Sequence, residues 1–319
     1  MNKKLSLPQT IITSLICVIM ILGVYYVQGL SILSVIVSAI FVVISTLSDN
    51  KGTCTSVTIV ILALMFFLNP VYIFDICLNC IIPGIIIGIA TKKVLTHNDE
   101  NKFEPIFTGV LAFILGLIAN YLISKYLFNI DMLAEFTKTM KEQLVTNTEI
   151  MQEYMAGLSS TPLKMDADSM MKLVLNIMPL IMFSRAIILS IIIYFIAIFT
   201  LKRIRKMDLK EIKFSRFYLP GNAVVTSFVM YLAIMLLEIF KIPLYTDLII
   251  INLESIFYIL FLIQGIAVTI FFAKKWFKSK QIFKFFVGLI SIFSFGIIAV
   301  SLVGMVDCVF DFRKLKVVN

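Results

Sequence analysis

Nine long apolar runs, separated by short polar segments, dominate this sequence. A helix needs about 20 apolar residues to cross the hydrocarbon core of a bilayer, which is roughly 30 Å thick. Most of the runs approach that length, and 60% of all residues are hydrophobic, so a soluble globular domain is excluded. The pattern predicts an all-α, polytopic transmembrane helical bundle of about nine spans. The runs cover residues 9–28, 30–47, 54–69, 75–91, 105–128, 173–201, 222–240, 248–273 and 283–305.

The basic residues predict the orientation of the chain. If the N-terminus is cytoplasmic, 18 of the 28 Lys and Arg residues fall in cytoplasmic segments, where membrane proteins retain them. The net charge of +9 is then a topological signal, so we expect the lipid bilayer as a partner and no nucleic acid. Abundant Lys, Ile and Phe are compatible with an AT-rich bacterial genome. We therefore predict a multi-pass protein of the bacterial cytoplasmic (inner) membrane with its N-terminus in the cytoplasm.

The side of the C-terminal tail decides between two span counts. Nine spans would leave the tail outside the cell, although it carries Arg313, Lys314 and Lys316. A re-entrant segment around Asn69 and Pro70 would give eight spans and return this basic tail to the cytoplasm. The sequence leaves both alternatives open.

One long polar segment divides the chain into three parts. Residues 129–171 carry apolar side chains at helical spacing, which predicts an extracytoplasmic amphipathic helical hairpin. The hairpin either packs on the outer membrane surface or closes as a lid over an outward-facing cavity. It separates an N-terminal half of five spans, residues 1–128, from a C-terminal half of four spans with a basic tail, residues 172–319.

Residues typical of enzymes are sparse. The sequence has no GxxxxGK[ST] phosphate-binding loop, and its single histidine, His97, lies among charged residues of a predicted loop. Cys77 and Cys80 form a CxxC without further zinc ligands, so we interpret them as free thiols, with a redox pair as the alternative. We therefore expect no metal site, no cofactor and no enzymatic activity, and an intramembrane enzyme is the weakest hypothesis.

Charged and amide side chains inside the apolar runs are the best candidates for function. Arg185 lies about 18 Å into its run, where an ionisable residue costs about 2.5–3.5 kcal/mol and needs compensation. One interpretation is an outward-facing polar pocket, in which Arg185 holds an anionic group and Glu254 a cation or proton. The other is a buried Arg185–Glu254 ion pair that sets helix register. The candidate binding residues are Arg185, Glu238, Asn252, Glu254 and Gln264.

Small residues recur on two of the predicted helices. Stripes of this kind let helix backbones approach closely in membranes. We predict packing within the chain, and docking of a membrane protein partner is the alternative. The positions are Gly84 and Gly88 on one helix, and Gly109, Ala112, Gly116 and Ala119 on the next.

Four short segments carry a family resemblance. They are Pro83–Gly88, Leu219–Asn222, Ile263–Ala267, and Asp307 with Phe310–Lys314. In this order they resemble the YybS-like family of predicted bacterial membrane proteins, which is associated with the substrate-binding S components of energy-coupling factor transporters. The resemblance implies a compact helical bundle that binds a small molecule, and it supplies no functional residues.

Two functional hypotheses follow. The leading one is S-component-like binding or transport of a small molecule through an outward-facing polar pocket. The alternative is a non-transporting cell-envelope scaffold or assembly protein, which would gather partners through the basic segments 202–216 and 274–284.

Overall fold

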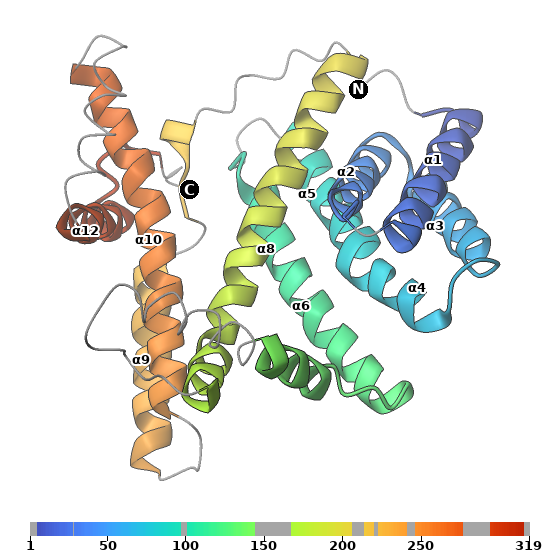
Figure 1. Ribbon diagram of the computed structural model, residues 1–319. Coiled ribbons are helices and arrows are strands. Elements are labelled where there is room, and N and C mark those ends of the chain that lie inside the picture. Colours follow the sequence, from blue (N-terminus) through green and yellow to red (C-terminus); the bar gives the residue numbers. More distant parts are fainter. Residues whose placement is uncertain are drawn as a thin grey trace, which may run out of the picture. The chain divides into compact units, whose positions relative to one another are not determined.

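The computed structural model describes residues 5–27, 29–96, 101–143, 167–205, 214–219, 223–240, 246–276 and 294–315. Within these ranges all regular elements are helices (Figure 1). The chain forms two compact units, Met1–Thr96 with Pro105–Met207, and His97–Glu104 with Asp208–Asn319. This division differs from the predicted boundary at residues 129–171. The long helix after that segment contacts helices of the N-terminal region and so belongs to the first unit.

The first unit begins with helices α1 to α3 and ends with the long helix α8. A short π-helix, η1, joins α4 to α5 without interrupting the helical path. The described residues also include a helix at 132–143 between α6 and α8. The bounds are α1 Leu7–Tyr26, α2 Ile32–Leu47, α3 Asn50–Leu64, α4 Pro70–Ile76, η1 Cys77–Ile81, α5 Ile82–Thr96, α6 Glu104–Leu127 and α8 Ala167–Arg205.

The second unit is built around the contact between α10, Thr246–Trp276, and α12, Ser294–Phe310. Glycines allow this contact, because a Cβ added at Gly265 would meet the Val300 carbonyl oxygen and one at Gly304 would meet that of Phe261. The helix α9, Ala223–Ile239, packs on both, and the short 3-10 helix η2, Phe214–Arg216, packs on α10.

Within the described residues a helix overlaps each of the nine predicted runs, so the prediction of a multi-pass helical membrane protein is confirmed. Among the described residues, five helices are long and apolar enough to cross a bilayer: Pro8–Tyr26, Pro70–Thr96, Glu104–Leu127, Val174–Ile204 and Thr246–Lys275. The other four apolar helices are shorter, covering Ile32–Leu47, Asn50–Leu64, Ala223–Ile239 and Gly296–Phe310. The exact span count therefore stays a prediction.

Part of the predicted hairpin is described. Asp131 begins the helix at 132–143, since its Oδ1 accepts hydrogen bonds from the backbone N–H groups of Leu133 and Ala134. This is an N-cap, which satisfies amides that have no partner within the first helical turn. The remainder of the segment, residues 144–166, lies outside the described residues.

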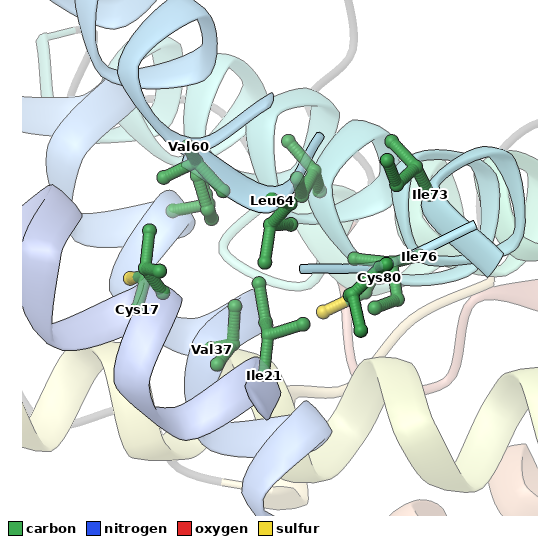
Figure 2. Close-up of a cluster of buried hydrophobic side chains, with 12 residues drawn as sticks. Cys17, Ile21, Val37, Val60, Leu64, Ile73, Ile76 and Cys80 are labelled. Atoms are coloured by element: carbon green, nitrogen blue, oxygen red, sulfur yellow. The ribbon is translucent and has the colours of Figure 1, made fainter. Parts of the chain in front are cut away.

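A core of aliphatic and thiol side chains holds the first unit together (Figure 2). Cys17 and Ile21 of α1 meet Val37 of α2 and Val60 and Leu64 of α3, and all five are at most 2% exposed. The residues on the opposite helix faces are apolar as well, and Ile19 of α1 for example is 70% exposed. An apolar interior combined with an apolar exterior fits a protein surrounded by lipid.

The helices α2 and α5 pack closely through small and hydroxyl residues. A Cβ added at Gly84 would lie 2.6 Å from the Ser38 carbonyl oxygen, and one at Gly88 would overlap the Ser45 hydroxyl. Thr46 Oγ1 donates to the Gly88 carbonyl oxygen at 3.1 Å. Glycine removes the side chain that would keep the backbones apart, and the hydroxyls then hydrogen-bond across the interface.

The helix α6 packs in the same way on α5, η1 and α8. A Cβ added at Gly109 would meet the Ser190 hydroxyl of α8 and Ile87 of α5, and one at Gly116 would meet the Leu78 carbonyl oxygen. Ala112 is buried and Ala119 half-buried on this helix. These contacts bring α6 and α8 to the wall of the cavity that carries the candidate site.

Candidate functional site

A cavity of about 400 Å³ lies within the first unit. Its walls come from α1, α2, α4, η1, α6 and α8, together with Met132 at the start of the following helix. The volume lies within the roughly 300–1,000 Å³ found for small-molecule pockets. Most of the lining is apolar, and the charged and amide side chains in it are Asp75, Asn79, Asn120 and Arg185.

Local sequence explains how η1 enters this wall. Pro83 has no backbone N–H, so the carbonyl of Asn79, four residues earlier, loses its ordinary helical donor. The backbone N–H of Ile82 bonds instead to the Cys77 carbonyl oxygen, five residues back, which is a π-helical turn. On this continuous helical path, one face lines the cavity. Its residues follow one another at alternating intervals of three and one: Tyr72, Asp75, Ile76, Asn79 and Cys80.

Asp75 is held in place by two amides. Asn79 Nδ2 donates to Asp75 Oδ1 at 2.7 Å, and Asn120 Nδ2 of α6 donates to the same oxygen at 2.8 Å. The other carboxylate oxygen, Oδ2, receives no hydrogen bond from any described residue. One oxygen of Asp75 is thus used to orient the group, and the second remains open to a ligand.

Arg185 faces the same cavity from α8. It lies 11 residues into the candidate span Val174–Ile204, about 17 Å along the helix. The part of the chain that the structure describes provides neither a hydrogen-bond acceptor nor an ion-pair partner for its guanidinium. A recess of about 10 Å³ lies between Asn79 and Arg185, enough for about one water molecule.

The thiols of the CxxC are free, as interpreted from the sequence. Cys80 is buried in the cavity wall, where its Sγ accepts a hydrogen bond from Ser38 Oγ and donates one to the Ser34 carbonyl oxygen, each at 3.1 Å. These bonds fix η1 against α2. Cys80 therefore has a packing role that its spacing from Cys77 does not reveal.

The other four predicted binding residues belong to the second unit. Asn252 is buried, and its Nδ2 donates to the Leu248 carbonyl oxygen at 2.8 Å within its own helix. Glu238 and Glu254 are exposed on α9 and α10. Gln264 is fully buried and lies in a hydrogen-bond network with residues close to the C-terminus.

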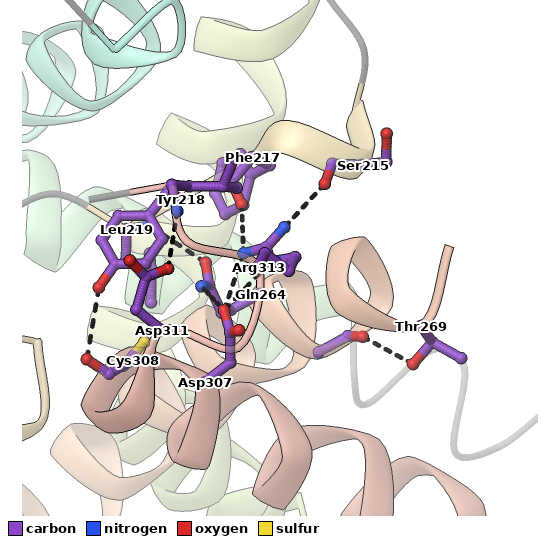
Figure 3. Close-up of polar contacts among 12 residues, drawn as sticks. Ser215, Phe217, Tyr218, Leu219, Gln264, Thr269, Asp307, Cys308, Asp311 and Arg313 are labelled. Atoms are coloured by element: carbon purple, nitrogen blue, oxygen red, sulfur yellow. Dashed lines mark hydrogen bonds and ion pairs between the residues drawn. The ribbon is translucent and has the colours of Figure 1, made fainter. Parts of the chain in front are cut away.

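That network closes around a single carboxylate oxygen (Figure 3). Asp307 Oδ2 accepts hydrogen bonds from Gln264 Nε2 at 2.8 Å and from Arg313 Nη2 at 2.9 Å. The Asp307 and Arg313 side chains are both fully buried. Gln264 also accepts the backbone N–H of Leu219 at 3.1 Å, so both ends of its amide are used within the protein.

Arg313 extends the network to the segment before α9. Its Nη1 donates to the Ser215 carbonyl oxygen at 2.9 Å, and its Nη2 donates to that of Phe217 at 2.8 Å. Tyr218 adds a further bond from its hydroxyl to the Cys308 carbonyl oxygen at 3.3 Å. The C-terminal residues are thereby fastened to the segment 214–219.

Sequence reasoning missed three residues of the cavity, Asp75, Asn79 and Asn120. Asp75 stands at the first position of its apolar run, where a charge is easily taken for the end of a span. Asn79 lies inside the CxxC, which drew attention to the cysteines. The useful signal was the spacing of four between Asp75 and Asn79, which places both on one helix face.

Comparison with known proteins identifies the family and little more. No curated protein and no solved structure matches the chain. A family model described as a predicted membrane protein (DUF2232) matches residues 14–308. The match includes every residue of the cavity and all of the second-unit network except Arg313. The chain therefore belongs to this family of predicted membrane proteins.

Proposed function

We propose that this protein binds a small molecule in the cavity of its first unit, from the extracytoplasmic side. The observation that carries this proposal is Arg185, whose guanidinium faces the cavity at membrane depth and has no partner among the described residues. Placing an arginine there costs about 2.5–3.5 kcal/mol, so its retention needs a compensating interaction. A bound anionic group would supply one.

The positions of the lining residues support an outward-facing site. With the N-terminus in the cytoplasm, as the basic residues predict, α1 and α6 would end outside, and α2, α4 and α8 would begin there. The lining comes from the last part of α1, the first part of α2, the middle and last part of α6 and the middle of α8, together with α4 and η1. Most of these segments would lie in the extracytoplasmic half of the bilayer, and the α8 residues would lie near its middle.

This proposal places the protein among binding or transport proteins rather than enzymes. Guanidinium, carboxylate and amide groups on apolar walls are the usual means of orienting a small ligand. The resemblance to the YybS-like family, and through it to S components of energy-coupling factor transporters, supports the same class. A bacterial cytoplasmic membrane is the expected location.

Ligand-induced stabilisation of the purified protein in lipid nanodiscs tests the proposal. A panel of anionic, cationic and zwitterionic metabolites and vitamins should contain at least one compound that raises the unfolding temperature of the wild type. Arg185→Gln should weaken its binding at least tenfold. The matched control Lys202→Gln removes an exposed positive charge from the same helix, about 25 Å from Arg185, and should bind like the wild type.

Two results would count against the proposal. If no compound stabilises the wild type and partner proteins instead co-purify with it in stoichiometric amounts, the scaffold hypothesis would replace this proposal. If Arg185→Gln binds every stabilising compound as the wild type does, the cavity is not the site. Glu254→Gln, measured in parallel, tests whether the predicted participation of Glu254 holds.

A further inference from the structure

We infer that the ligand of this cavity is a small zwitterion with an apolar body, whose cationic group binds Asp75 and whose anionic group binds Arg185. This inference rests on the proposed function and adds the charge class of the ligand. It draws on Asp75, the second charged side chain of the cavity wall, which the proposed function does not require.

Asp75 has the geometry of a preorganised acceptor. Its Oδ1 receives amide N–H groups from two different helices, at 2.7 and 2.8 Å, and these bonds hold the carboxylate in one orientation. Its Oδ2 receives none from the described residues, and the side chain is only half-buried in the cavity wall. We assign Oδ2 to an ammonium group, since a carboxylate oxygen accepts charge-assisted hydrogen bonds from such donors.

Arg185 supplies the opposite charge. A guanidinium carries five N–H donors in a planar fork that matches a carboxylate or phosphate. None of these donors is used by the described part of the chain. The Arg185 side chain is exposed on its helix and lines the cavity, so an anionic group can reach it.

The two charges do not neutralise each other directly. Asp75 and Arg185 form no ion pair, although both face one cavity, and the Asn79 amide and a water-sized recess lie beside Arg185. A ligand with a single charge would neutralise one of them and leave the other in a mostly apolar site. Because an unpaired charge in such surroundings is costly, the site favours a molecule that carries both charges.

The remaining walls define the rest of the ligand. Ile21, Val24, Phe113, Leu117 and Leu189 surround the charged groups with aliphatic and aromatic surface. Apolar surface of this kind favours an apolar body over a second polar one. The chemical class that combines these features is an α-amino acid with an apolar side chain, or a zwitterion of similar size.

Three leucine compounds test the charge requirement in nanodisc-embedded protein. L-leucine carries both charges, its methyl ester carries only the cation, and N-acetyl-L-leucine carries only the anion. The same series is measured for phenylalanine, isoleucine, valine and methionine. We expect at least one free amino acid to bind, measured by calorimetry, and both of its derivatives to bind at least tenfold more weakly.

Two variants test which residue causes the preference for the free amino acid over each of its derivatives. In Arg185→Gln the affinities for the free amino acid and for its methyl ester should differ by no more than about threefold. In Asp75→Asn the amide oxygen still accepts the bonds of Asn79 and Asn120, but the preference over the N-acetyl compound should be lost. The controls Lys202→Gln and Asp247→Asn should keep both preferences. Arg185→Lys, which retains the charge, should recover part of the preference for the free acid.

The outcomes separate this inference from the proposed function. A ligand with one charge that depends on Arg185 and not on Asp75, with no binding of the amino acids, would overturn the zwitterion and leave the proposed function standing. Equal affinity for a free amino acid and either derivative would also overturn it. If no compound of the wider panel binds either, both proposals fail.

Discussion

In the second unit Asp307 and Arg313 bond to each other, whereas in the first unit Asp75 and Arg185 face a shared cavity without pairing. The Asp307–Arg313 pair is fully buried, and Arg313 and Gln264 use their donors on Asp307 Oδ2 and on backbone carbonyls. Asp307 Oδ1 makes no hydrogen bond within the described residues, but it is buried and does not face the cavity. In the cavity, amides orient one oxygen of Asp75 and leave the second open.

Under the proposed function, the same two residue types serve structure in the second unit and binding in the first. A pair that is closed by its neighbours stabilises one conformation and has little left to offer a ligand. Charges that are held apart by a cavity are costly to retain, and a bound molecule of matching charge lowers that cost. Substitutions should therefore affect stability in the second unit and binding in the first.

The largest effect on stability is expected from Arg313→Ala. It removes the partner of a fully buried carboxylate and leaves Asp307 with a buried charge, a change that costs about 3–5 kcal/mol in comparable pairs. Equilibrium unfolding in detergent micelles measures the loss. The control Arg216→Ala removes an exposed arginine of the same unit and should have little effect. A loss below about 1 kcal/mol for Arg313→Ala would remove the contrast between the two units.

Gln264→Leu should destabilise the protein by less, about 1–3 kcal/mol. The substitution leaves the buried N–H of Leu219 without its acceptor and takes one donor from Asp307, while the volume of the side chain is nearly kept. The same unfolding experiment measures it. Ligand binding to the first unit should not change, and a selective loss of binding would show that Gln264 belongs to the ligand site, as the sequence alone predicts.

Arg185→Gln should not lower the stability of the ligand-free protein. The arginine has no partner to lose among the described residues, and the substitution removes a costly charge from membrane depth. Unfolding without ligand checks this prediction. Destabilisation as large as that of Arg313→Ala would identify Arg185 as part of a structural ion pair.

The smallest effect is expected at Asp131, which caps the helix that carries Met132 of the cavity wall. The backbone N–H of Ala134 lowers the pKa of the Asp131 carboxyl by bonding to its charged form. Because this pKa is lower in the folded state, the stabilisation is present at neutral pH and is lost as the pH falls through the folded-state value, below the usual value of about 4. Amide-exchange protection factors, which correct for the pH dependence of intrinsic exchange, should fall in residues 132–143 on acidification or in Asp131→Ala, while Asp247→Ala should leave them unchanged.

Hydropathy predicted the helices well, because membrane depth selects long apolar segments whatever their neighbours are. It also identified Arg185, since a single charge within such a segment stands out. It could not identify the partners of these residues. Whether Gln264 contacts a ligand or Asp307 depends on the packing of α12 on α10. Hydropathy missed Asp75 because this residue stands at the edge of the predicted run 75–91. In the structure the helical path already begins at Pro70, so Asp75 lies inside the candidate span.

The bonds from Arg313 to the carbonyls of Ser215 and Phe217 also constrain membrane topology. If these two contacting segments lie at the same face of the bilayer, we predict an even number of crossings between them, whereas the apolar runs 222–240, 248–273 and 283–305 predict three. The C-terminus would then share the compartment of the segment that precedes α9. Cysteines introduced at positions 216 and 317 should therefore react with impermeant reagents from the same side.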